Sequence, residues 1–127
     1  MKLRIKGNSL RLRVSRSELA RFQAEGRIEE TIHFTAALEA TLTYALESAT
    51  GASPVTVRYE PGEVTVILSK DRARVWGAQS EIGVYTTLDM GPAGSLEVVV
   101  EKDFACLDRS DEDNSDTFAN PLAGATC

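Results

Sequence analysis

The sequence has few of the residues that build disulfide frameworks and zinc sites. Its 127 residues include two cysteines, one histidine and one tryptophan. Two thiols are too few for a disulfide scaffold, so we expect free thiols in a reducing compartment. Zinc usually takes three or four Cys or His ligands, and the chain offers only Cys106, Cys127 and His33. We therefore expect no structural zinc site.

Long apolar segments and recognised catalytic motifs are also absent. No apolar run approaches the ~20 residues that a membrane span needs, and the alternating N-terminus lacks the apolar region of a secretory signal. A glycine-rich phosphate loop and a nucleophile elbow are missing as well. These absences predict a cytoplasmic protein, and nothing in the sequence indicates an enzyme. The length is typical of one domain, residues 1–127.

The net charge of −5 is unevenly distributed along the chain. Residues 1–27 contain eight lysines and arginines against only Glu18 and Glu25. Beyond residue 102 the balance reverses, because Arg109 faces a run of acids comprising Asp103, Asp108, Asp111, Glu112, Asp113 and Asp116. A basic start and an acidic end indicate either neutralisation within the fold or two separate binding surfaces.

The opening segment KLRIKGNSLRLR is predicted to be a β-hairpin. Apolar and basic residues alternate on both sides of Gly7-Asn8, and glycine at the first central position suits a type II′ turn. The resulting register places Arg4 opposite Arg11 and Lys2 opposite Arg13. Like charges opposite each other are destabilising, so we expect a negative group over this face.

An internal repeat is the clearest pattern in the chain. Residues 1–48 align with 55–102 at a constant offset of 54, which aligns Phe22 with Trp76 and Arg4 with Arg58. Because the offset is even, side chains on one face of a strand in the first copy lie on the same face in the second. We predict an α+β fold of two β-β-α-β-β repeats related by a pseudo-twofold axis, with mostly antiparallel sheets and two short helices around a shared core.

The predicted elements follow from alternation and capping signals. In the first repeat, a Ser15/Glu18 capping box and Gly26 bound a helix, and Gly77 should keep the second helix short. The strands are predicted at 2–6, 9–14, 28–34 and 41–47 in the first repeat, and at 55–60, 63–68, 82–88 and 95–102 in the second.

Residues 103–127 fall outside the repeat. Alternation stops and turn-forming residues prevail, so we expect an irregular acidic tail anchored by Phe104, Leu107, Phe118 and Leu122. The opening MKLRIKGNSLRLR, the stretch VEKDFACL, the acidic run and TFANP resemble an uncharacterised family of short bacterial proteins, a domain of unknown function. Ala119 replaces a proline of the family pattern. The resemblance covers the whole chain and implies no activity or cofactor.

Two candidate sites emerge, and neither has a specific motif. The basic face of the hairpin is a candidate for anion binding, through Lys2, Arg4, Arg11 and Arg13. The tail is a candidate for a divalent cation, because carboxylate oxygens and thiols are metal ligands, although the pattern lacks the glycine and terminal glutamate of an EF-hand. Its possible ligands are Asp103, Cys106, Asp108, Asp111, Asp113 and Asp116.

A simpler interpretation is that acidic residues of the same chain neutralise the basic face. Arg4 and Arg58 recur at the repeat offset together with Glu47 and Glu101, so we predict that each arginine pairs with a glutamate on an adjacent strand. The acidic tail would then cover the remaining basic side chains. On this interpretation His33 is an exposed residue on the polar side of its strand, and Cys106 is buried and inert.

The sequence therefore favours a small non-catalytic interaction protein that meets an unidentified protein partner. The alternative is a ligand-binding protein that uses the tail for a divalent metal, or the hairpin for an anion or nucleic acid. We do not favour nucleic acid, because the sequence pI is about 4.9 and aromatic residues are not interleaved with the basic ones.

Overall fold

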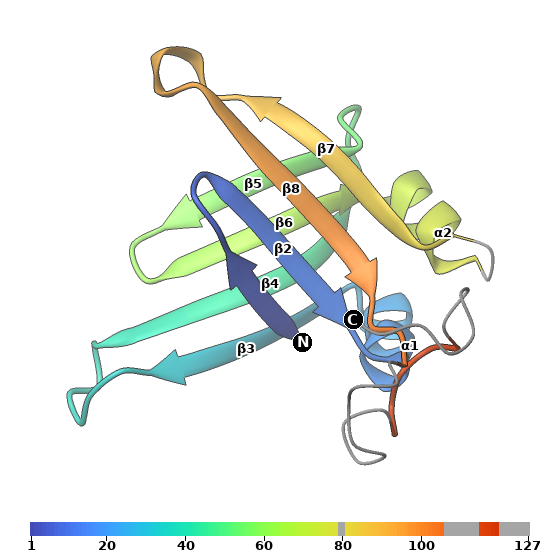
Figure 1. Ribbon diagram of the computed structural model, residues 1–127, viewed down its shortest axis with the longest axis horizontal. Helices are drawn as coiled ribbons and strands as arrows, with labels where there is room; N and C mark the ends of the chain where they lie inside the picture. Colours follow the sequence, from blue (N-terminus) through green and yellow to red (C-terminus); the bar gives the residue numbers. More distant parts are fainter. Residues whose placement is uncertain (79–80, 106–114, 120–127) are drawn as a thin grey trace.

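The computed structural model has an α+β fold and describes residues 1–78, 81–105 and 115–119 (Figure 1). None of the helices in these segments has the length and apolarity that a membrane span requires. The elements are β1 (Lys2–Ile5), β2 (Ser9–Val14), α1 (Arg16–Glu25), β3 (Arg27–His33), β4 (Thr41–Ala49), β5 (Val55–Glu60), β6 (Glu63–Ser69), α2 (Lys70–Gly77), β7 (Gly83–Asp89), the 3-10 turn η1 (Gly91–Ala93) and β8 (Ser95–Lys102).

The eight strands form two four-stranded sheets that draw on both ends of the chain. Sheet A has the order β1-β2-β8-β7, and sheet B has the order β3-β4-β6-β5. The outer pairs of each sheet are antiparallel, whereas the central pairs β2–β8 and β4–β6 are parallel. Both sheets are therefore mixed, and neither is made from one half of the sequence alone.

The predicted register of the opening hairpin is confirmed. Leu3 lies opposite Leu12, and Arg4 lies opposite Arg11. Gly7 has a φ of +56°, whereas no described residue other than glycine has a positive φ. This combination fits the type II′ turn, which requires a positive φ only at its first central position.

Both helices begin at the predicted serine caps. The Ser15 side chain accepts from the Glu18 amide, and the Glu18 carboxylate accepts from the Ser15 amide, so the capping box is complete. Helix α1 ends at Gly26, whose φ of +78° is left-handed. The Ser69 side chain caps α2 by accepting from the Arg72 amide, and α2 ends at Gly77, which agrees with the predicted short helix.

The hydrophobic core lies between the two sheets and is closed at one end by the helices. Both helices lie at the same end of the molecule, where they contact each other and strands of sheet B (Figure 1). Phe22 of α1 and Trp76 of α2 are fully buried and meet edge to face, with ring centroids 6.1 Å apart. The predicted shared interior around these two rings is confirmed. The sheets contribute mainly leucine and valine to it: Leu10, Leu12, Val14, Leu46, Val66, Leu68, Val84, Val98 and Val100.

Candidate functional site

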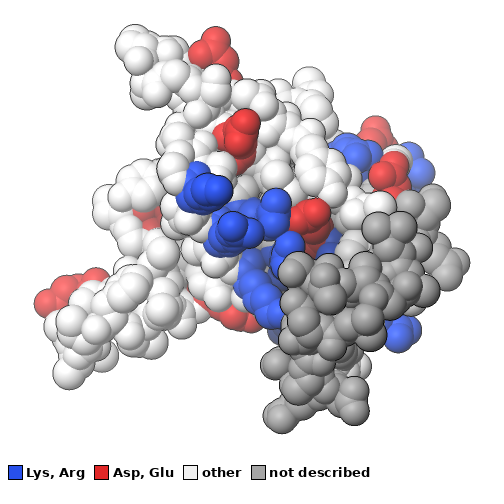
Figure 2. Space-filling model, in the orientation of Figure 1, with Lys and Arg blue, Asp and Glu red and all other residues white. Residues whose placement is uncertain are grey.

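The outer face of sheet A carries the basic side chains of the hairpin. Strand alternation and the β1–β2 register place Lys2, Arg4, Arg11 and Arg13 on this one face, and Figure 2 shows a basic cluster there. The structure thus brings together all four residues that the sequence suggested for anion binding. Lys6 extends the cluster, because it lines a pocket with Arg4 and Arg11.

Glu101 of β8 is the main negative group over this face. Its Oε1 lies 3.2 Å from Arg11 Nε and 3.8 Å from Arg13 Nε. These are ion pairs without hydrogen-bond alignment, since the buried Oε1 accepts no hydrogen bond from a described residue. Tyr85 donates its hydroxyl hydrogen to Glu101 Oε2 at 2.9 Å. Burial, and then this carboxylate, raise the pKa of Tyr85.

Among the described residues, only one of the two predicted arginine–glutamate pairs forms. Arg58 Nη1 lies 3.4 Å from Glu47 Oε2, although β6 lies between their strands, so the expected adjacency is wrong. The corresponding prediction for Arg4 is not met within the described residues, because Glu101 is held by the two arginines of β2. At the positions 54 residues after those arginines stand Thr65 and Ile67, which leave Glu47 available to Arg58.

Arg4 and Lys6 are consequently the uncommitted cations of the basic face. Neither forms an ion pair with another described residue, and both side chains are solvent-exposed. They line a small pocket of about 200 Å³ with Ser9, Arg11 and Glu97. The Arg4 guanidinium and the Lys6 ammonium around one hollow can bind an oxyanion by charge and hydrogen bonds. The Ser9 hydroxyl donates instead to the Lys6 carbonyl at 2.5 Å.

A buried ammonium group forms a second polar cluster, which sequence reasoning missed. Met1 is buried, and its amino group donates to Glu18 and to Glu30, the latter at 2.7 Å. Tyr44 donates its hydroxyl hydrogen to Glu30 at 3.0 Å. Glu18 was recognised only as a helix cap, and its second role depends on the fold bringing strand β1 to helix α1.

The charges of this cluster shift the pKa values of two of its members. Burial alone would raise the pKa of Glu18, but the hydrogen bond from the Met1 ammonium and that from the Ser15 amide lower it below 4.5. Burial and the neighbouring Glu30 carboxylate raise the pKa of Tyr44 to about 12. The cluster therefore holds an ionised Glu18 at neutral pH.

The acidic tail is only partly described, and its described carboxylates have protein partners. Asp103 Oδ2 lies 3.0 Å from Lys2 Nζ. Asp116 accepts from the Ser17 amide at 3.1 Å and from the Ser17 hydroxyl, which places it at the N-terminus of α1. Tail docking is thus confirmed at Lys2, while Asp116 caps a helix instead of covering the arginines.

The predicted metal ligands are not assembled by the described segments. No group of three or more His, Cys, Asp or Glu side chains within them is placed to hold a metal ion. Asp103 and Asp116 line a pocket of about 350 Å³, but both are engaged as given above. The other candidates lie outside the described residues: Cys106, Asp108, Asp111 and Asp113.

Aromatic packing anchors the described part of the tail. Phe104 and Phe118 form an isolated β-bridge, and their ring centroids are 6.2 Å apart. The Lys102 ammonium lies 5.5 Å from the centroid of Phe118 and donates to the Ala78 carbonyl at 2.7 Å. The two phenylalanine anchors are confirmed, whereas Leu107 and Leu122 lie outside the described residues.

An ion-pair network covers the outer face of sheet B. Arg27 contacts Glu47 at 3.0 Å and Glu63 at 2.7 Å. Burial alone would raise the pKa of Glu47, but hydrogen bonds from Arg27 and Arg58 lower it, so this carboxylate stays charged and neutralised. His33, at the far end of β3, is exposed as predicted.

Comparison with known proteins agrees with the resemblance seen in the sequence. No curated protein and no solved structure matches the chain. The model of one family does match, over residues 1–122, and its description is a family of unknown function (DUF7009). Since the match includes both halves and most of the tail, the chain belongs to the DUF7009 family of unknown function.

Proposed function

We propose that this chain is a small non-catalytic interaction protein that binds an acidic segment of a partner protein on the outer face of sheet A. The supporting observation is the pocket formed by Arg4, Lys6 and Arg11. Two of its three cations, Arg4 and Lys6, have no ion pair within the described residues. The proposal also takes the protein to be cytoplasmic, as the cysteine content suggests.

The charge pattern of this face favours a short acidic peptide over a nucleic acid. Five cations lie on β1, β2 and the turn between them, whereas Glu97 and Glu101 lie on the neighbouring β8. A phosphate backbone needs a longer positive track than these five side chains provide, and the carboxylates of Glu97 and Glu101 interrupt the positive surface at β8. Individual carboxylates of an extended peptide can instead contact Arg4 and Lys6 alone.

Reversing the two uncommitted charges should abolish most of this binding. We expect the Arg4→Glu/Lys6→Glu variant to bind a fluorescein-labelled peptide of alternating Asp, Glu and Ser at least about tenfold more weakly than the wild type, as each tenfold corresponds to ~1.4 kcal/mol. Both residues are exposed, so the fold should be retained. Fluorescence anisotropy at about 0.15 M salt, where distant charges are screened, is the measurement.

The Arg16→Glu/Arg74→Glu variant is the matched control, because it makes the same change in net charge at two exposed helix positions outside the basic face. It should bind the peptide as the wild type does. An equal loss of peptide affinity in both variants would show that net charge alone causes the effect, and it would overturn the proposal. Tighter binding of a single-stranded oligonucleotide than of the peptide would also overturn it.

We further infer that residues 1–48 and 55–102 descend from one duplicated unit and are related by a pseudo-twofold axis. At the offset of 54, the counterparts of β1, β2, β3 and β4 are β5, β6, β7 and β8. Replacing each strand of sheet A by its counterpart gives the strand order of sheet B, and the parallel pair β2–β8 then corresponds to the parallel pair β4–β6. Contact between Phe22 and Trp76 is what a nearby axis would produce. In an experimental structure, one twofold rotation should superpose the halves; unrelated environments for the two rings would contradict the inference.

A further inference from the structure

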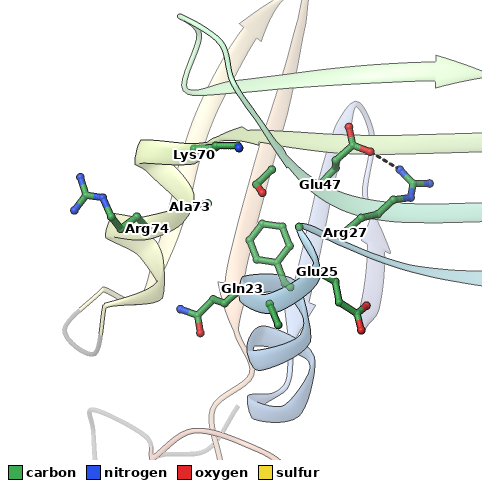
Figure 3. A pocket seen from close by; sticks show the side chains of 11 residues that line it. Gln23, Glu25, Arg27, Glu47, Lys70, Ala73 and Arg74 are labelled. Carbon is green, nitrogen blue, oxygen red and sulfur yellow. Dashed lines mark hydrogen bonds and ion pairs between the residues drawn. The ribbon is translucent and has the colours of Figure 1, made fainter.

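Another pocket, which no residue of the basic hairpin lines, lies between the two helices. It has a volume of about 740 Å³ and is lined by the C-terminal turn of α1, the first turns of α2 and adjoining residues of β3 and β4 (Figure 3). Cavities of this size commonly hold small molecules. Phe22, Ala24 and Ala73 provide its apolar lining.

Three polar groups of the lining have no partner within the described residues. Lys70 forms no ion pair there, and neither the Gln23 amide nor the Ser48 hydroxyl forms a side-chain hydrogen bond. Figure 3 shows the Lys70 side chain extending across the pocket toward the side that carries Glu47. All three groups can donate hydrogen bonds, so the pocket is rich in donors.

The other charges in the lining are neutralised or directed elsewhere. Glu47 is paired with Arg27 at 3.0 Å, as the dashed line in Figure 3 marks. Arg74 points away from the pocket and lies 3.7 Å from Asp71, and Glu25 also points away from Lys70. Lys70 is therefore the one lining charge that both points into the pocket and has no described partner.

Gly77 lies beside the side chain of one lining residue, Gln23. A Cβ atom at this position would lie 2.3 Å from Gln23 Nε2, a distance that real structures do not contain. The absence of a side chain thus allows the Gln23 amide to lie against the end of α2.

We propose that this pocket is a binding site for a small organic carboxylate with a compact apolar body. The carboxylate contacts the Lys70 ammonium and the Ser48 hydroxyl, and the apolar body packs on Phe22 and Ala73. A monoanion suits the site better than a phosphate dianion, because only one uncommitted ammonium faces the ligand and the Glu47 carboxylate lies across from it. The site is independent of the acidic-peptide surface on sheet A.

Benzoate is a suitable probe, and NMR titration of the full chain is a suitable measurement. Benzoate should shift the backbone amide signals of Gly26, Ser48 and Ala73, and the neutral isostere benzamide should bind about tenfold more weakly. Lys70→Gln should weaken benzoate binding by a similar factor. Arg16→Gln removes one positive charge from the exposed start of α1, outside both proposed sites, and should leave benzoate binding unchanged.

Several outcomes would overturn the proposal. Benzoate shifts that persist unchanged in Lys70→Gln, or that vanish equally in Arg16→Gln, would show that Lys70 is not the anion contact. Inorganic phosphate that shifts the same amides as strongly as benzoate would show that the apolar lining does not select the ligand. No shift at these amides at millimolar benzoate would refute the site directly.

Discussion

Replacing Trp76 with alanine should lower the free energy of unfolding by about 3–5 kcal/mol, the range for truncating a buried aromatic side chain. The ring is fully buried between the sheets and the helices, and its Nε1 donates to the Ile82 carbonyl at 3.4 Å. It also packs edge to face on Phe22, a contact that adds about 0.5–1.5 kcal/mol beyond area burial. Urea unfolding followed by far-UV circular dichroism measures the loss, because Trp76 is the only tryptophan.

A second aromatic residue supplies the control for this prediction. Tyr59 is 72% exposed, so Tyr59→Ala should change the free energy of unfolding by less than ~0.5 kcal/mol. Trp76→Phe keeps a ring in the core and should fall between the wild type and Trp76→Ala, which keeps the prediction testable if the alanine variant does not fold. A loss below about 1 kcal/mol for Trp76→Ala would place the ring outside the cooperative core.

Replacing Glu18 with glutamine should cost about 2–3 kcal/mol at neutral pH. The substitution leaves an oxygen that can accept from the Ser15 amide, so the helix cap is retained while the charge facing the Met1 ammonium is lost. Removing one partner of a buried ion pair generally costs about 3–5 kcal/mol of stability. The expected cost is smaller here because Glu30 still contacts the Met1 ammonium. Chemical unfolding at pH 7 measures the difference.

The same variant should reveal the ionisation of Glu18. A carboxyl group whose pKa is lower in the folded protein stabilises the fold above its ordinary pKa of 4.5, and this stabilisation is lost as the pH falls through the folded value. The difference between wild type and Glu18→Gln should therefore be constant near neutrality and shrink below pH 4.5. Glu25→Gln, on the exposed end of α1, should show neither effect; a pH-independent difference for Glu18→Gln would contradict the prediction.

Local signals in the sequence were sufficient for most elements of the fold. Apolar alternation located the strands, and the Ser15 and Ser69 caps located both helix starts, because these features depend only on neighbouring residues. The pairing of β2 with β8 and of β4 with β6 could not be predicted in this way. Parallel pairing between distant strands depends on how the sheets close around the core.

The candidate sites show the same division between local and distant information. The register of one hairpin was enough to place Arg4 and Arg11 on a common face. The position of Glu101 beside Arg11 and Arg13 requires the β2–β8 pairing, so Arg4 was wrongly expected to receive a glutamate. The pocket near Lys70 combines residues from α1, α2, β3 and β4, and no spacing within a single element indicates it.

The central position of β8 in sheet A has a consequence for biosynthesis. During translation, β2 emerges early, but its parallel neighbour is not complete until residue 102 has left the ribosome. Until then, the nascent β1–β2 hairpin exposes an unpaired strand edge and the leucines that later enter the core. Such long-range strand pairing slows folding and leaves intermediates prone to aggregation. The charged side chains on the outer face of this hairpin keep it hydrated before β8 is made. They also disfavour pairing of its exposed edge with the same hairpin of another chain.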